Sequence, residues 1–306
     1  MAGENLAVID VGSNSLRCMI ARVKDQSVEI LEKKLTSTRL ARGMTKNKNL
    51  ENDSMDNSLE VLKKYRRLID KYEARLSRAV GTSALRNAKN SNLFLEKVKK
   101  ETGVGIEIIS GTEEAFLSAR GALFDKNNVD LYLVFDLGGG SLELISKEPE
   151  FVKSLEVGAV NLLEQAKNTR DGIDLDKLAL IVENSLRDEI NYNDKRIKDK
   201  KYLVGVGGTA TSFPAINQGM ESYDGNKVQD YYLEKERIYE LTTWLDGMPI
   251  SDRKKVKGMP KNREEIIVPG GGIIYALLEH LGYQGYYASD RGLMYGILYE
   301  EIKKRK

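Results

Sequence analysis

The stretch LYLVFDLGGGSLELIS at residues 131–146 repeats the layout of LAVIDVGSNSLRCMIA at residues 6–21. Each stretch is an apolar, β-rich run that ends at an aspartate, turns at a glycine two residues later and continues into a second apolar run. This pattern predicts a strand, a tight turn and a returning strand. The aspartates are Asp10 and Asp136. Because the pattern occurs twice, it indicates an internal duplication of one fold, the alternative being chance similarity between two hairpins.

The segments that follow the first hairpin complete a mixed sheet flanked by helices. We expect a third strand at 28–35, an amphipathic helix over 55–76 and, after further short strands and a helix, a helix that opens at residues 110–115. The pattern then restarts after the polar stretch FDKNNVD at 124–130. The sequence thus predicts an α/β protein of two domains, residues 1–124 and 125–306, with a C-terminal helix over 290–306 packing back on the first domain.

Composition excludes several classes of protein. The chain has 306 residues, of which 41% are hydrophobic and 31% charged, and this is typical of a globular cytoplasmic protein. It has no apolar run long enough to span a membrane and does not start like a secretory signal. With only Cys18 and His280, it cannot form an internal disulfide, a Cys/His zinc site or a familiar nucleophilic triad. Any metal must therefore have oxygen ligands, which favours Mg²⁺, Mn²⁺ or Ca²⁺.

The net charge of +2 gives no general attraction to polyanions, but positive charge is concentrated locally. The basic runs are DKRIKDKK at 194–201, RKKVKGMPKNR at 253–263 and KKRK at 303–306. They are either solvated loop and helix faces or a basic rim that guides a polyanion other than nucleic acid.

Glycine-rich turns at strand ends are suited to phosphate binding. Without Cβ atoms, backbone N–H groups can converge on a phosphate oxygen, and serine adds a hydroxyl donor. Two further glycine clusters, at 204–212 and 268–272, each precede an expected helix whose N-terminus could face an anion. The candidate phosphate-binding residues are Gly12, Ser13, Asn14, Ser15, Gly138, Gly139, Gly140, Ser141, Gly207, Gly208 and Thr209.

Carboxylates near these turns are candidate metal ligands. Asp10 and Asp136 end apolar strands and could hold Mg²⁺ directly or through water. Glu143, seven residues after Asp136, could face the same space; the alternative is a solvent-facing strand residue.

The stretch SGTEEA at 110–115 offers a candidate base. Ser110 followed by Glu113 forms a capping box, which accounts for Glu113 structurally. Glu114 has no such explanation and could accept a proton from an attacking water, although acidic residues are common at helix starts. Arg86, in GTSALRNA, is either a guanidinium clamp for phosphate or an ordinary helix-surface arginine.

Taken together, these motifs resemble the exopolyphosphatase / guanosine pentaphosphate phosphohydrolase family of the actin-like ATPase-domain superfamily. The matching stretches run in the family's order over nearly the whole chain: AVIDVGSNS, GTSALRNA, IISGTEEA, VFDLGGGSLELI, SLEVGAVNL, VGVGGTATS, VPGGG and ASDRGLMYGIL. The combination of SGTEEA and DLGGGSLE is specific to the family. Glycine hairpins alone would indicate only the superfamily.

The resemblance implies a duplicated ribonuclease-H-like fold with the active site in a cleft between the domains. It implies that Glu114 activates the hydrolytic water and that Asp136 and Glu143 act in metal binding and catalysis. The aspartate and turn of the family's DxGSNS motif correspond to Asp10 through Ser15, and the family's arginine before the helix corresponds to Arg86. The reaction would remove the terminal phosphate of inorganic polyphosphate by in-line water attack, assisted by Mg²⁺ or Mn²⁺. Guanosine pentaphosphate is the alternative substrate, and a homodimer is expected.

Two features depart from the family pattern. Met294 stands where many relatives have an arginine, so a phosphate contact there depends on whether Arg291 replaces it. The helical C-terminal domains of long family members do not follow in this sequence. We therefore expect a preference for shorter polyphosphate chains or for a nucleotide as the substrate.

Two other classes of protein with the same fold compete with this interpretation: an ATP-dependent small-molecule kinase and a nucleotide-binding scaffold. Phosphate transfer to an acceptor would indicate the kinase, and polymerisation that survives Glu114→Gln would indicate the scaffold.

Overall fold

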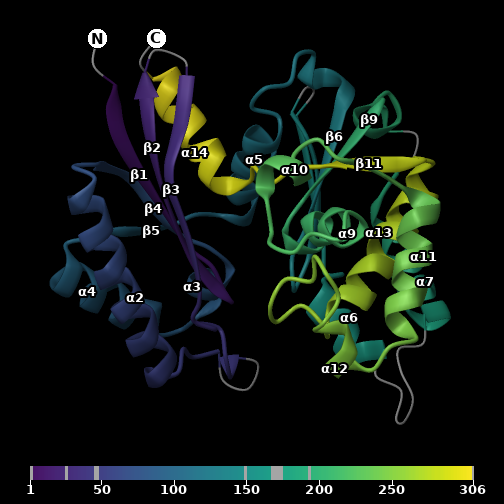
Figure 1. Ribbon diagram of the computed structural model, residues 1–306, viewed down its shortest axis with the longest axis horizontal. Coiled ribbons are helices and arrows are strands. Elements are labelled where there is room, and N and C mark those ends of the chain that lie inside the picture. Colours follow the sequence, from purple (N-terminus) through teal and green to yellow (C-terminus); the bar gives the residue numbers. More distant parts are fainter. Residues whose placement is uncertain are drawn as a thin grey trace. The chain divides into compact units, whose positions relative to one another are not determined.

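A computed structural model describes residues 3–24, 27–44, 48–147, 150–166, 175–191 and 194–304 of the chain. The chain divides into two compact units (Figure 1). Unit 1 consists of Met1–Leu117 and Leu293–Lys306, and unit 2 of Ser118–Gly292. The division falls inside helix α5 (Gly111–Ala122), whereas the sequence places the boundary between residues 124 and 125.

Unit 1 is built on a five-stranded mixed sheet with the strand order β3-β2-β1-β4-β5. The first three strands form an antiparallel meander, and β4 and β5 continue the sheet parallel to β1. The elements are β1 (Glu4–Val11), β2 (Ser15–Lys24), β3 (Ser27–Ser37), α2 (Asn52–Lys71), β4 (Arg75–Gly81), α3 (Ser83–Asn87), α4 (Ser91–Thr102), β5 (Ile106–Ile108) and α14 (Leu293–Lys303).

Both faces of this sheet are covered, so the central strand is apolar and buried from Leu6 to Ile9. Alternate residues of β1, such as Ala7 and Ile9, join a core with α2 and α4. Helix α14 packs against β1 and β4 (Figure 1). This double burial explains why the sequence shows a continuous apolar run, not strict alternation. Cys18 lies in the core, where burial raises the pKa of its thiol to about 12, as expected of a structural cysteine.

Unit 2 contains a six-stranded sheet with the order β10-β11-β9-β6-β7-β8. The strands are β6 (Tyr132–Leu137), β7 (Leu142–Ser146), β8 (Phe151–Leu155), β9 (Tyr202–Val206), β10 (Tyr232–Glu234) and β11 (Gly285–Ala288). The helices are η1 (Val129–Leu131), α6 (Ala159–Ala166), α7 (Leu175–Glu189), α8 (Lys195–Lys198), α9 (Gly208–Asn217), α10 (Gly225–Val228), α11 (Lys235–Asp246), α12 (Ile250–Arg253) and α13 (Ile267–Leu281).

The two sheets repeat one topology. The order β8-β7-β6-β9-β11 in unit 2 corresponds to β3-β2-β1-β4-β5 in unit 1: in each, three strands form an antiparallel meander and two more strands run parallel to its first strand. Strand β10 is an addition at the edge of the second sheet. The hairpins that the sequence aligns, β1–β2 and β6–β7, occupy the same place in each sheet. The duplication is thus a property of the whole topology as well as of one sequence pattern.

Two expectations about local structure were wrong. The helix expected over 55–76 ends at Lys71, because Glu73 takes a left-handed conformation (φ 49°) and Arg75 begins β4. The glycines at 270–272 lie inside α13 and do not form a loop that precedes it. A Cβ at Gly270 would overlap Thr209, and one at Gly271 would overlap Thr242. Gly270 and Gly271 therefore allow α13 to pack closely against its neighbours.

Among the described residues, none of the helices combines the length and the apolarity that crossing a bilayer requires. Of the basic run at 303–306, Arg305 and Lys306 lie outside the described residues.

Candidate functional site

The first glycine turn, between β1 and β2, directs its carbonyl groups into its own unit. The Gly12 amide donates to the Ser15 carbonyl at 3.1 Å and closes the turn. The segment after β3 then donates to the carbonyls at the tip: Thr38 to Asn14 at 3.0 Å and Ala41 to Ser13 at 2.9 Å.

The second turn, between β6 and β7, repeats this arrangement. The Gly138 amide donates to the Ser141 carbonyl at 3.0 Å. The start of α6, which follows the third strand of its sheet, donates to the carbonyls at the tip: Val160 to Gly139 at 2.8 Å and the Asn161 side chain to Gly140 at 2.8 Å. The chain runs so close here that a Cβ at position 158 would overlap the Gly139 carbonyl.

These hydrogen bonds use the carbonyl groups of both turns and leave backbone amides for a ligand. Within the described residues, the backbone amides of Ser13, Asn14, Gly139 and Gly140 donate no hydrogen bond to the protein. Successive amides that point outward from a turn form a concave anion-binding group, and glycine lets an oxygen approach closely. Both turns can thus accept a phosphate.

The position seven residues after each aspartate distinguishes the two hairpins. In the first, Asp10 is the cross-strand partner of Arg17, whose Nη1 lies 3.6 Å from Asp10 Oδ2. In the second, Asp136 is the partner of Glu143. Asp10 is only 5% exposed; burial raises the pKa of its carboxyl, and the Arg17 guanidinium opposes this. Arg17 was not singled out from the sequence, although aligning the two repeats places it opposite Glu143.

The side chains at the hairpin in unit 2, Asp136 and Glu143, fit a magnesium-type ion better than Asp10 and Arg17 at the hairpin in unit 1. Asp136 and Glu143 lie side by side on one face of the sheet, and the Ser154 hydroxyl donates to Glu143 Oε1 at 2.9 Å. In the part of the chain that the structure describes, no three His, Cys, Asp or Glu side chains gather into a metal site. Mg²⁺ is usually held by one or two carboxylates, with waters and substrate phosphates completing its shell. Beside Asp10, by contrast, Arg17 already supplies a positive charge.

The loop after β9 comes directly against Asp136. Gly207 has a left-handed conformation (φ 92°), and a Cβ there would lie 2.6 Å from the Leu137 carbonyl and 2.9 Å from Asp136 Oδ1. Only glycine allows this approach. The loop leads into α9, whose N-terminal amides face away from the helix, as an anion site requires.

Two contacts at the start of α9 were not apparent from the sequence. Thr209 is 1% exposed, and its side chain packs against Gly270 of α13. Arg263 was considered only as part of a basic run, but its guanidinium lies against Gly208, where a Cβ would overlap it. The structure thus places an arginine beside this candidate anion-binding loop, from a segment more than 50 residues later.

Arg86 and Glu114, assigned separate roles from the sequence, come together in unit 1. Arg86 Nη1 donates to Glu114 Oε2 at 3.2 Å and to the Ile109 carbonyl at 2.8 Å. Each side chain is 31% exposed. They follow β4 and β5, which end at the same edge of the sheet as β1, because the three strands are parallel. Carboxyl ends of parallel strands are where α/β proteins commonly bind ligands.

The capping box at the start of α5 is only half formed. Ser110 Oγ accepts the Glu113 amide at 3.1 Å, as expected. The Glu113 carboxylate, however, accepts from Arg78 Nη2 at 2.9 Å. Its role is therefore an ion pair with β4, which the sequence did not reveal.

Several cations of the basic runs have internal roles. Arg253 is 6% exposed and donates to the carbonyls of Leu245 and Met248. Lys200 is 8% exposed and donates through Nζ to the Asp130 carbonyl at 2.5 Å. These residues stabilise unit 2 and cannot form a solvated rim.

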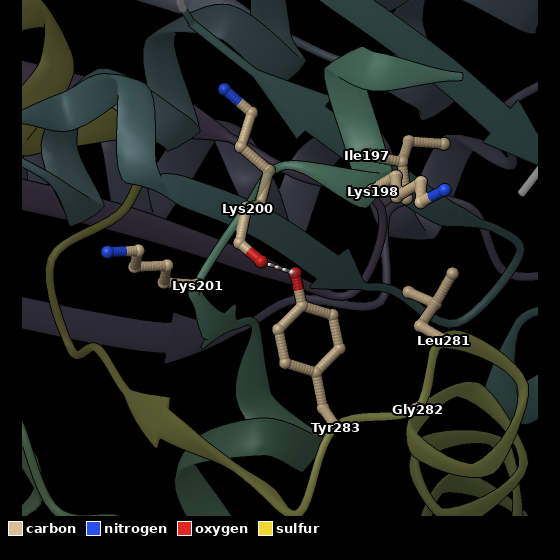
Figure 2. A pocket seen from close by; sticks show the side chains of 7 residues that line it. All are labelled: Ile197, Lys198, Lys200, Lys201, Leu281, Gly282 and Tyr283. Atoms are coloured by element: carbon tan, nitrogen blue, oxygen red, sulfur yellow. Dashed lines mark hydrogen bonds between the residues drawn. The ribbon is translucent and has the colours of Figure 1, made fainter. Parts of the chain in front are cut away.

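A cavity of about 490 Å³ lies beside the run at 194–201 (Figure 2). Its wall includes Tyr283, whose hydroxyl donates to the Lys200 carbonyl at 3.2 Å and whose pKa burial raises to about 12. Figure 2 shows the ammonium groups of Lys198, Lys200 and Lys201 pointing in three different directions. The cavity does not concentrate positive charge at one point, and none of the predicted site residues line it.

Comparison with known proteins places this chain in a family. The sequence profile of the Ppx/GppA phosphatase family matches residues 19–305. The chain belongs to this family. A Ppx/GppA family member from Aquifex aeolicus, known from its crystal structure, has the same fold, with a TM-score of 0.86, 30% identity and coverage of 99% of both chains. The predicted fold class, α/β with a duplicated ribonuclease-H-like (actin-like ATPase) fold, is confirmed.

Two curated proteins similar to this Ppx/GppA chain carry different names. One, from Fusobacterium nucleatum, is a bifunctional 3-dehydroquinate synthase/phosphatase, 30% identical over 98% of this chain and 47% of its own length. The other, from Photobacterium profundum, is a guanosine-5'-triphosphate,3'-diphosphate pyrophosphatase, 28% identical over 98% of this chain and 60% of its own. The chain thus spans about half of the length of these relatives.

Proposed function

We propose that this chain is a phosphohydrolase that removes the terminal phosphate of inorganic polyphosphate by metal-assisted attack of water. The Ppx/GppA family match and the amides of both glycine turns that donate no hydrogen bond within the described residues support a phosphoanhydride substrate. The observation that carries the proposal is the contact between Arg86 and Glu114, because it sets a candidate base beside a candidate phosphate clamp.

In this mechanism the arginine and the glutamate have complementary tasks. An incoming phosphate competes with Glu114 for the Arg86 guanidinium, which binds phosphate oxygens well. The carboxylate thus released accepts a proton from a water that attacks the terminal phosphorus, and the shortened chain leaves. Amides of the glycine turns hold phosphate oxygens and stabilise the charge that develops on them.

Asp136 and Glu143 are the residues that would hold Mg²⁺ or Mn²⁺. When bound, such an ion would neutralise charge on phosphate oxygens. Gly207 allows the neighbouring loop to approach Asp136 closely.

Guanosine pentaphosphate is the second candidate substrate. Relatives from Photobacterium profundum and Pseudoalteromonas atlantica, each 28% identical, are named guanosine-5'-triphosphate,3'-diphosphate pyrophosphatases. Like polyphosphate, this nucleotide presents a terminal phosphoanhydride.

One experiment tests the proposal: steady-state phosphate release from polyphosphates of defined length and from guanosine pentaphosphate, with Mg²⁺ and with EDTA. We expect metal-dependent release, with the higher kcat/KM for polyphosphate. A higher kcat/KM for guanosine pentaphosphate would select the second candidate. Release from neither substrate, or transfer of phosphate to an acceptor other than water, would contradict the proposal.

A further inference from the structure

Arg78 of β4 lies at the centre of an ion-pair cluster that the reaction described above does not use. Its Nη2 lies 2.8 Å from Glu107 Oε2 and 2.9 Å from Glu113 Oε1, and its Nη1 lies 3.8 Å from Glu300 Oε2. The three glutamates belong to three elements, β5, α5 and α14. The arginine side chain is 16% exposed, whereas those of Glu107 and Glu113 are 58% and 42% exposed, so water screens these contacts from the carboxylate side only.

The cluster borders the candidate base directly. Glu113 and Glu114 are neighbours in the first turn of α5, and their carboxylates bind two different arginines. Arg78 lies before the end of β4 and Arg86 lies in the helix after it. Two guanidinium groups from one continuous segment thus hold the first turn of α5. Because the residues are adjacent on a helix, a shift of Glu113 also moves the backbone of Glu114.

Helix α14 contacts α5 one turn after Glu113. A Cβ at Gly296 would overlap the carbonyl of Leu117, so the backbones of α14 and α5 are in close contact. Glu300, one turn after Gly296, reaches Arg78. The arginine therefore links α14, β4 and the start of α5 through its ion pairs.

We propose that Arg78 is a positioning residue for hydrolysis: by holding Glu113 together with Glu300, it fixes the first turn of α5 and hence the carboxylate of Glu114 beside Arg86. The inference rests on the proposed function, in which Glu114 is the base. It assigns Arg78 no contact with the substrate. Its loss should thus lower kcat much more than it raises KM.

The test compares Arg78→Gln with Arg75→Gln in steady-state phosphate release from polyphosphate. Arg75 is a matched control: it lies on the same strand and pairs with Glu4 at 2.6 Å and with Glu301 of α14 at 3.5 Å, but not with α5. Since misplacement of a reacting group by about 1 Å can cost about 100-fold in rate, we expect Arg78→Gln to lower kcat by about 10- to 100-fold. We expect KM within about threefold of wild type, and Arg75→Gln near wild type in both.

Two further variants separate positioning from a general loss of stability. Arg78→Lys keeps a charge at this position and should recover part of the lost kcat. Glu113→Gln breaks one pair and leaves Arg78 its contacts with Glu107 and Glu300, so it tests the link to α5 even if Arg78→Gln does not fold. The double variant Arg78→Gln/Glu113→Gln should be no slower than Arg78→Gln alone, because both changes break the same link.

A kcat for both Arg78→Gln and Glu113→Gln within about twofold of the Arg75→Gln control would overturn the inference. If the wild type releases no phosphate, or if Glu114→Gln keeps full activity, the proposed function itself fails. If Glu114→Gln is inactive while the Arg78 and Glu113 variants are fully active, only the positioning role fails.

Discussion

Arg86 and Glu114 form an ion pair in which Nη1 of the arginine lies 3.2 Å from Oε2 of the glutamate. The two residues are 28 positions apart and come from α3 and α5, after neighbouring parallel strands. The pair gives each residue a partner before any substrate arrives. An arginine that exchanges a carboxylate for a phosphate would couple substrate binding to release of the base.

Glu114→Gln tests the base. The amide keeps the shape of the side chain and can still contact Arg86, but it cannot accept a proton from water. Because general base catalysis typically contributes 10²- to 10⁴-fold, we expect kcat to fall by at least about 100-fold, with substrate affinity largely unchanged. Phosphate release and equilibrium binding of polyphosphate measure the two effects. Hydrolysis at nearly the wild-type rate would remove Glu114 from the mechanism.

Arg86→Met tests the phosphate clamp. A hydrogen bond to a charged group is worth about 1.5–3 kcal/mol, so we expect kcat/KM to fall by about 10- to 100-fold. Lys89→Gln is the control, because Lys89 is an exposed cation just after the same helix. Equal, small effects of the two substitutions would mean that Arg86 is an ordinary surface arginine.

The sequence predicted the duplicated architecture because its signals are local. Apolar strands that end at Asp10 and Asp136, followed by glycine turns, define both hairpins without any knowledge of distant contacts. The strand orders of the two sheets then repeat, as the duplication requires. The pairing of Arg86 with Glu114 was not predicted, because it depends on the register of β4 and β5.

The remaining errors concern residues whose roles depend on tertiary neighbours. A run of three glycines looks the same in a phosphate loop and in a helix that packs closely, and only Thr209 and Thr242 show that Gly270 and Gly271 belong to the second kind. Arg253 looked like a surface cation until its carbonyl partners were known. Arg263 reaches Gly208 across a long sequence separation, and no local pattern indicates this contact.

The metal requirement can be tested through a residue that is not itself a proposed ligand. The Ser154 hydroxyl donates to Glu143, and partners that orient a metal ligand typically contribute 10- to 100-fold to metal affinity. We expect Ser154→Ala to raise the Mg²⁺ concentration for half-maximal phosphate release by about tenfold, with little effect at saturating Mg²⁺. Ser27→Ala, which removes an exposed serine hydroxyl in unit 1, is the control. An unchanged Mg²⁺ titration would argue against Glu143 as a ligand.

Gly207→Ala tests how closely the loop after β9 approaches Asp136. The added methyl would lie 2.6 Å from the Leu137 carbonyl and 2.9 Å from Asp136 Oδ1, in addition to the strain of a positive φ. We expect a lower melting temperature and a loss of activity of at least about tenfold if the displaced carboxylate binds the metal.

Gly219→Ala is the matched control for this substitution. Gly219 also has a positive φ (59°), but nothing lies within 4 Å of the position that an added methyl would take. We expect it to cost about 1 kcal/mol of stability from backbone strain alone, without loss of kcat. Equal effects of the two alanines on kcat would show that crowding at Asp136 is unimportant.

His280, the one histidine of the sequence, should make stability depend on pH below neutrality. Burial in the last turn of α13 lowers the pKa of its imidazole from 6.5. The unfolded chain therefore binds a proton at a higher pH than the folded chain does, and the free energy of unfolding falls as pH drops through about 6.5. Urea unfolding at pH 7.5, 6.5 and 5.5 measures this change. The variant His280→Gln is the control, because all other titratable groups contribute equally to the pH dependence in both proteins. The wild type should therefore lose more stability on acidification than this variant. Equal losses in the two proteins would exclude the buried imidazole as a source of the pH dependence.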